Sequence, residues 1–129
     1  MQWTATQRFV FLGLKLAHQG DDELQAEERA VVVNAARAMA MASKVDEHEA
    51  DEWIKDAIVF YEDARAQQKA DDLVKDSVAA LGGLAPDIRT ALLRGLRHVA
   101  MACDGVNRAE HEWIQDLREA WGVDLLAEA

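Results

Sequence analysis

The chain has 129 residues, half of them hydrophobic, and a formal net charge of −10. This length suffices for one domain with a buried core, and the acidic balance argues against nucleic acid or an anionic membrane surface, which both attract basic patches. A single cysteine excludes an internal disulfide, and no apolar run approaches the roughly 20 residues that span a bilayer. No signal peptide is evident, so we expect a cytoplasmic protein without membrane insertion.

Hydrophobic periodicity predicts an all-α, single-domain bundle of six or seven helices over the whole chain. The first helix follows a Thr4 or Thr6 cap and runs to about His18. The second begins near Ala26 and is apolar on almost every side from Ala30 to Ala42. Because a helix without a clear polar face is usually buried, we expect the bundle to form around the second and fifth helices.

The remaining helices are bounded by local signals, namely capping residues, proline and glycine. We expect the third from the cap Asp46 to about Gln67, the fourth from Asp71 or Asp72 to Gly82, the fifth from Pro86, the sixth from about Arg108 to Trp121, and a short seventh from Asp124 to Ala127. In the fifth helix, Gly95 marks a close helix crossing. The predicted core face of the fifth helix consists of Ile88, Leu92, Leu96, Val99 and Cys103.

The sequence also contains an internal repeat. Ala-Met-Ala recurs at residues 40–42 and 100–102, and Glu-Trp-Ile recurs at residues 52–54 and 112–114. Three turns share an apolar residue, a polar cap and a glutamate three positions after the cap, and they lie at residues 24–28, 45–49 and 106–110. The chain is therefore predicted to be built on repeated helix–acidic turn–helix units.

The third acidic turn contains the residue types that bind a hard cation. Calcium takes about six to eight oxygens from carboxylates, carbonyls and water. Asp104 and Glu110 would supply two carboxylates, and Gly105 would let the backbone bend inward. The turn is too short to surround an ion alone, so Asp22 and Glu28 of the first turn are the candidate additional ligands. Turn formation and helix capping explain the same residues without a metal.

The third turn also carries a family resemblance. Ala-Cys-Asp-Gly at the end of an apolar helix, with a glutamate opening the next helix, resembles the TerB-like family of tellurite-resistance proteins. The resemblance covers most of the chain, because all three acidic turns fit such a bundle. It implies an all-helical bacterial cytoplasmic protein of tellurite and stress response, with an acidic surface that binds divalent metal. By position Asp104 and Glu110 match best, and Asp22 and Glu28 match from the first turn.

Two positions depart from the family pattern. Ser43-Lys44 stands where the second copy would carry Asp-Gly, and a lysine there would repel a cation. Cys103 replaces the commoner alanine, and its place on an apolar face favours a packed thiol.

A second hypothesis needs no metal. The acidic run at residues 47–52 is either a solvated helix start or a docking surface, and in the latter case the domain is an interaction scaffold that recruits a basic protein partner. An enzyme is not expected, since we find neither a nucleophile–base pair nor a cofactor motif.

The remaining candidates are histidines and tryptophans. We expect His48 and His111 to be solvated at helix starts and His98 to be half-buried beside the core. Trp53, Trp113 and Trp121 have helical spacing and are expected in the core. Trp3 is the candidate contact with a partner or with the second subunit of a homodimer.

Overall fold

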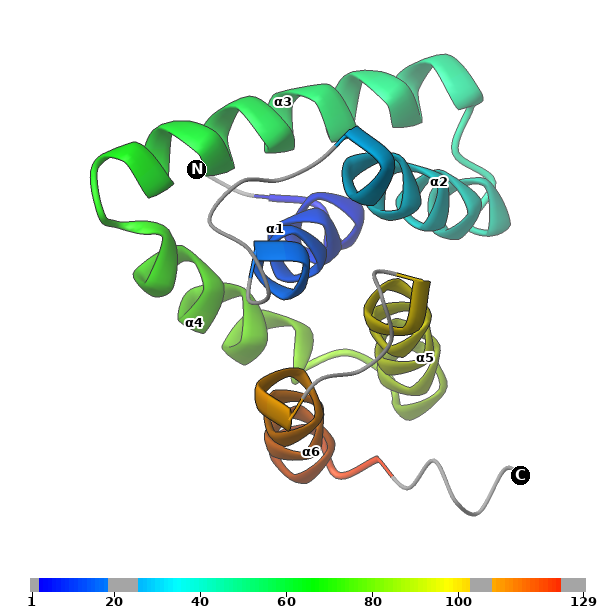
Figure 1. Ribbon diagram of the computed structural model, residues 1–129. Helices are drawn as coiled ribbons and strands as arrows, with labels where there is room; N and C mark the ends of the chain where they lie inside the picture. The colour runs from blue at the N-terminus through cyan, green and yellow to red at the C-terminus, as the bar shows by residue number, and fades with distance from the viewer. Residues whose placement is uncertain (1–2, 19–25, 103–107, 124–129) are drawn as a thin grey trace.

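The computed structural model describes residues 3–18, 26–102 and 108–123, except for the side chains of residues 18, 26–28, 102 and 108–110. Within these ranges the chain forms six helices and no strand (Figure 1): α1 (Ala5–His18), α2 (Ala26–Ala42), α3 (Glu47–Ala66), α4 (Ala70–Leu81), α5 (Pro86–Ala102) and α6 (Arg108–Trp121). The all-α class is therefore confirmed. The expected seventh helix and Cys103 lie outside the described residues, and the TerB-like fold and the repeated unit stay predictions.

Helix α1 lies at the centre of the bundle, where it packs against α2, α3, α4 and α5, while α6 packs mainly against α5. Its large side chains are almost completely buried: Phe9, Val10, Phe11, Leu12, Leu14 and Leu16. The prediction that α2 occupies the centre was wrong. Among the described side chains of α2, residues 29–42, only one row is buried, Val32, Ala36 and Ala40, and Ala38 and Met41 are exposed. The physical reason is side-chain size, because alanine gains little free energy from burial and is tolerated at the surface.

Local capping explains where the helices begin. The backbone N–H of Gln7 donates to Thr4 Oγ1 (3.1 Å) and the Gln7 side chain accepts from the Thr4 N–H (3.0 Å), so a capping box starts α1. Asp46 starts α3 by accepting from the N–H of His48 at 3.1 Å. Helix α4 begins earlier than predicted, at Ala70, so that Asp71 lies in its first turn and does not cap it.

Three of the helix ends that the structure describes share the same hydrogen-bonded motif. At the end of α2, the N–H of Val45 donates to the carbonyl of Ala40 (3.1 Å), and Lys44 adopts the left-handed conformation with a φ of 65°. Helix α3 ends in the same way at Gln68 (φ of 60°), and α6 ends so at Gly122 (φ of 64°). These are Schellman motifs, whose left-handed residue is usually glycine. Only α6 carries the favoured residue.

We expect Lys44→Gly to raise the free energy of unfolding by about 0.5–1 kcal/mol, since glycine reaches the left-handed region without a steric penalty. Lys44→Ala is the matched control, because it removes the same charge but keeps the Cβ atom. Urea unfolding followed by circular dichroism measures both variants. Equal stability of the glycine and alanine variants would contradict the prediction.

Two glycines allow close helix crossings. A Cβ atom at Gly95 would lie 3.0 Å from Phe9 Cε2, which confirms the predicted crossing at this residue. A Cβ atom at Gly13 would lie 2.9 Å from Val32 Cγ1, between α1 and α2. The sequence did not single out Gly13, because a glycine inside a helix does not reveal which neighbour approaches it.

Several expected core positions are corrected by the structure. Ile88 is 44% exposed, so the core face of α5 is carried by Leu92, Leu96 and Val99 together with Leu93. His98 is exposed and not half-buried. Trp121 is buried as predicted, whereas Trp53 and Trp113 are half-buried. In each case hydrophobic periodicity located the helix, but the neighbouring helices decided how much of its surface was covered.

Trp3 packs on its own chain. Its ring meets Phe11 edge-on, with ring centroids 5.1 Å apart, and lies 4.6 Å from the ring of Phe60. This aromatic cluster attaches the N-terminus to α1 and α3. An intramolecular contact therefore accounts for much of the surface of Trp3, which the sequence suggested as a partner contact.

Candidate functional site

The predicted cation ligands lie at the borders of the described part of the chain. Asp22 and Asp104 are outside the described residues, and so are the side chains of Glu28 and Glu110. The described backbone places Glu28 in the first turn of α2 and Glu110 in the first turn of α6. Both glutamates thus lie in the first turn of a helix, as the capping pattern predicted.

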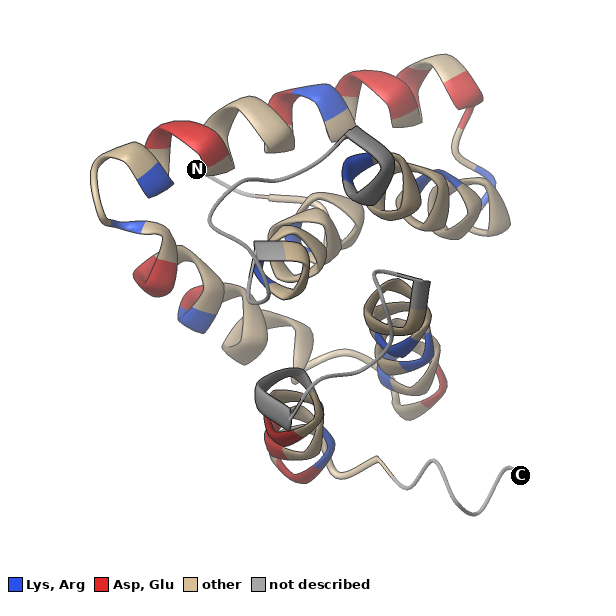
Figure 2. Cartoon of the chain, in the orientation of Figure 1, with Lys and Arg blue, Asp and Glu red and all other residues tan. Residues whose placement is uncertain are grey.

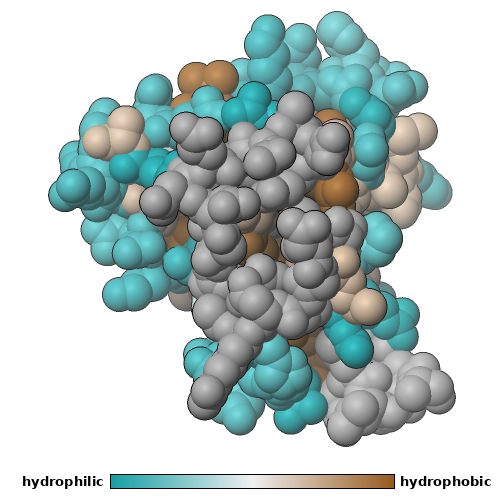
Figure 3. All heavy atoms as spheres, in the orientation of Figure 1, coloured by the Kyte–Doolittle hydropathy of each residue, from teal (hydrophilic) through white to brown (hydrophobic). Residues whose placement is uncertain are grey.

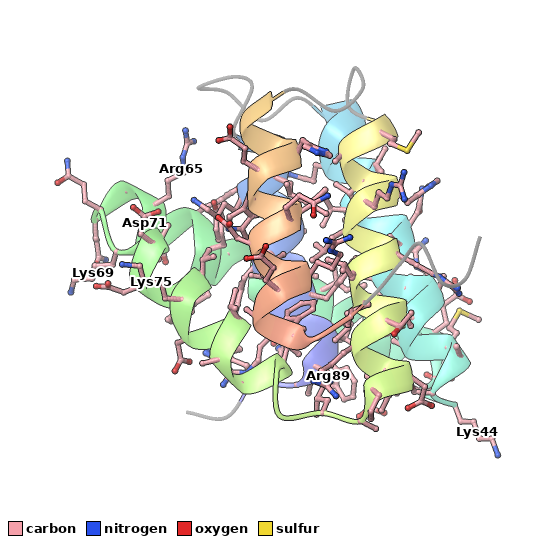
Figure 4. The ribbon with its side chains drawn as sticks, turned by 90° about the horizontal axis from the view of Figure 1, so that it is seen from below. Lys44, Arg65, Lys69, Asp71, Lys75 and Arg89 are labelled. Atoms are coloured by element: carbon pink, nitrogen blue, oxygen red, sulfur yellow. The ribbon has the colours of Figure 1, made fainter. Side chains whose placement is uncertain are left out.

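The helix ends that flank the first and third acidic turns lie at the same end of the bundle. In Figure 1 the last residues of α1 and α5 and the first residues of α2 and α6 all face the viewer, and in Figure 4 they lie at the upper end. Lys44, in the second turn, lies at the opposite end (Figure 4). The tertiary structure therefore groups the helix ends that flank the first turn with those that flank the third, and it places the second turn at the other end.

The electrostatics of this end also follow from helix direction. The C-terminal ends of α1 and α5 lie there, and the last carbonyl groups of a helix lack partners within it. Such an end carries a partial negative charge, but the N-terminal ends of α2 and α6 lie at the same end of the bundle and carry a partial positive charge, so the helix dipoles oppose one another there. Among the described side chains, no three His, Cys, Asp or Glu residues come close enough to hold a metal ion.

A second candidate surface is the outer side of α3. This helix carries seven carboxylates against Lys55 and Arg65, and Figure 2 shows the acidic residues along its length. Most of these carboxylates are exposed: Glu47, Glu49, Glu52, Asp56, Glu62 and Asp63. The surface is thus strongly acidic, as the sequence predicted for residues 47–52.

Two ion pairs join this acidic helix to α2. Arg37 Nε donates to Asp51 Oδ1 at 2.8 Å, and Arg29 pairs with Glu62. The hydrogen bond to Asp51 and the negative charge of its carboxylate raise the pKa of Arg37 above its usual value. Asp51 and Glu62 therefore serve the packing of α2 on α3, while the other exposed carboxylates of α3 remain available to a partner.

The two histidines that the sequence placed at helix starts lie there in the structure. His48 and His111 are exposed at helix starts, as expected. None of the described helices combines the length and the apolar character that crossing a membrane requires. No family model matches the chain, and neither a curated protein nor a solved structure matches it.

Proposed function

We propose that this chain is a non-enzymatic, TerB-like helical module that binds a divalent cation, calcium, through its first and third acidic turns. The observation that supports this proposal is the common position of the four helix ends that flank these turns (Figure 4). The ligands proposed from the sequence are Asp22, Glu28, Asp104 and Glu110. Carboxylate and carbonyl oxygens are the ligands that calcium prefers.

A calcium site needs ligands from more than one acidic turn. One short acidic turn cannot supply the about six to eight oxygens that calcium requires. The helix ends that flank the two turns lie at one side of the bundle, which supports a site that takes carboxylates from both turns. The last carbonyl groups of α1 and α5, which lack partners within their helices, are further candidate oxygen ligands there. A role in tellurite or stress response is the part of the proposal that comes from the family resemblance.

Calorimetric titration of chelator-stripped protein with calcium tests the proposal. We expect saturable binding that Asp104→Asn or Glu110→Gln weakens by about tenfold or more, because charge-assisted metal ligation is lost while an uncharged residue of similar size remains. Asp56→Asn is the matched control, since it removes an exposed carboxylate of α3 far along the chain from both turns. Absence of binding up to millimolar calcium, with the helical circular dichroism intact, would contradict the proposal.

The acidic outer surface of α3 supports a second candidate function, an interaction scaffold for a basic protein. The exposed carboxylates of α3 are the specific observation in its favour. Complementary charge of this kind accelerates association and selects partners of opposite sign. In this case the acidic turns are helix caps, and calcium has no part in the function.

The scaffold function is distinguished by its response to chelator and to charge reversal. A Lys-rich model peptide should bind equally well with and without chelator. Combined reversal of Glu47, Glu49 and Glu52 to lysine should weaken its binding by about tenfold, the sum of three exposed ion pairs. Reversal of Asp87, an exposed residue at the start of α5, is the control. The single reversal changes the net charge by +2 and the triple reversal by +6, so an effect of Asp87→Lys about one third as large in free energy would show non-specific attraction by net charge alone.

A further inference from the structure

A groove of about 520 Å³ lies between α4 and α6, with α1 beneath it. Its walls are apolar: Val74, Val78 and Ala79 come from α4, and Trp113, Leu117 and Ala120 come from α6. Trp113 and Val78 are half-buried, so part of their apolar surface faces the groove and not the core. The volume falls within the range of about 300–1,000 Å³ that is usual for ligand sites.

The two helices that form the groove are joined near their C-terminal ends. There, Trp121 Nε1 donates to the carbonyl of Val78 at 3.0 Å, and its ring lies against Gly82. From there α4 and α6 diverge toward their N-terminal ends, as Figure 4 shows. The lining residues of α4 extend from Asp71 to Ala79, which corresponds to about 12 Å along the helix axis.

The rims of the groove carry opposite charges. Lys75 lies on the α4 side and Asp116 on the α6 side, and both are exposed. Lys15 pairs with Asp71 at 3.5 Å, but neither Lys75 nor Asp116 forms an ion pair with another described residue. Figure 4 shows Lys75 and Asp71 beside each other on α4. A ligand that carries one charge of each sign would match these two rims.

The chemistry of the walls selects the shape of that ligand. The walls are helices, whose backbone N–H and C=O groups are already bonded within the helix, so they offer no edge for an extended strand. A polypeptide that enters the groove must satisfy its own backbone hydrogen bonds, and an α-helix does so. Apolar side chains at positions i, i+3 or i+4, and i+7 of a helix span about 10.5 Å, which fits the length of the groove.

We propose that the groove between α4 and α6 docks an amphipathic α-helix of another protein. Its apolar stripe packs between Val78 and Leu117, an acidic residue on one side of the stripe meets Lys75, and a basic residue on the other side meets Asp116. None of the residues that line the groove is a proposed cation ligand or an acidic residue of α3, so the inference does not depend on the proposed function.

A displayed library of helical peptides of about 16 residues, long enough for partial helicity in isolation, tests the proposal. Selection on the wild-type chain should enrich peptides with apolar residues at i, i+3 or i+4, and i+7, flanked by one acidic and one basic position. Ala79→Glu, at an exposed position of the groove wall, should weaken their binding by about tenfold or more, because it places an unpaired charge against the apolar stripe. Ala80→Glu, one residue further along α4 and outside the groove, is the matched control.

Charge reversal gives a second readout that a change in folding does not produce. Selection on Lys75→Glu should exchange the acidic position of the enriched peptides for a basic one and leave the apolar stripe unchanged. Failure to enrich such peptides, or equal loss of binding in Ala79→Glu and Ala80→Glu, would overturn the proposal. Binding of dodecanoate in the groove without any selected peptide would also overturn it and assign the groove to a small amphiphile.

Discussion

Replacement of Trp121 by alanine is expected to lower the free energy of unfolding by about 3–5 kcal/mol. The side chain is 1% exposed and is the largest fully buried one in the described part of the chain. It lies at the end of α6 and joins this helix to α4 through the hydrogen bond from its indole N–H to Val78. Its own carbonyl accepts from Arg89 Nη1 at 2.6 Å, which joins α6 to α5. Truncation leaves a large cavity where three helices meet.

Urea unfolding of Trp121→Ala measures this loss, and two further variants separate its causes. Trp121→Phe keeps most of the ring volume but removes the indole N–H, so a smaller loss of about 1 kcal/mol is expected from the hydrogen bond. Trp113→Ala, in the same helix but half-buried, should cost less than Trp121→Ala. A cost below about 1 kcal/mol for Trp121→Ala would mean that α6 is not anchored as described.

Truncation of Leu12 to alanine is the second prediction with a large effect, a loss of about 2–5 kcal/mol in the free energy of unfolding. Leu12 is 0% exposed in α1, the helix that packs against four others. The cavity left by the truncation would be surrounded by helices packed on several sides of α1, which cannot easily move in to fill it. The loss of stability should therefore lie in the upper part of this range. Thermal and urea unfolding would measure it.

The matched comparison for Leu12 is Met41→Ala in α2, the helix that the sequence placed at the centre. Met41 is 48% exposed, so its truncation should change stability by less than about 0.5 kcal/mol. Similar costs for the two variants would contradict the central position of α1. The difference in the free energy of unfolding between the two variants therefore tests whether α1 or α2 lies at the centre of the bundle, because it depends on packing and not on helix propensity.

The starts and ends of the helices could be predicted well from the sequence. Thr4, Asp46 and Pro86 are found at or beside the predicted helix starts, and α6 ends before Gly122. Capping depends on a side chain and on backbone groups two or three residues away, so the information is local. The exception is α4, for which the sequence predicts a start at Asp71 or Asp72. Its N-cap residue is Lys69, whose side chain makes no capping hydrogen bond, so no local signal marks this start.

The candidate cation ligands could be selected from the sequence, but their grouping could not. Asp104 and Asp22 were chosen from turn patterns far apart in the chain. Only the path of the helices shows that the first and third turns connect helix ends on one side of the bundle, with Lys44 on the other. The groove had no sequence signal, because Val74 and Leu117 read as ordinary core positions in their separate helices.

The sequence by itself determined that the chain is all-helical, where most helices begin and end, and which face of each is apolar, because these properties depend on contacts within a few residues. Only the tertiary structure decided that α1 is central, that Ile88 and His98 are exposed, and that Gly13 faces Val32. These properties depend on which apolar faces meet. Several helices present similar faces, and the free energy of packing large side chains together selects among their arrangements.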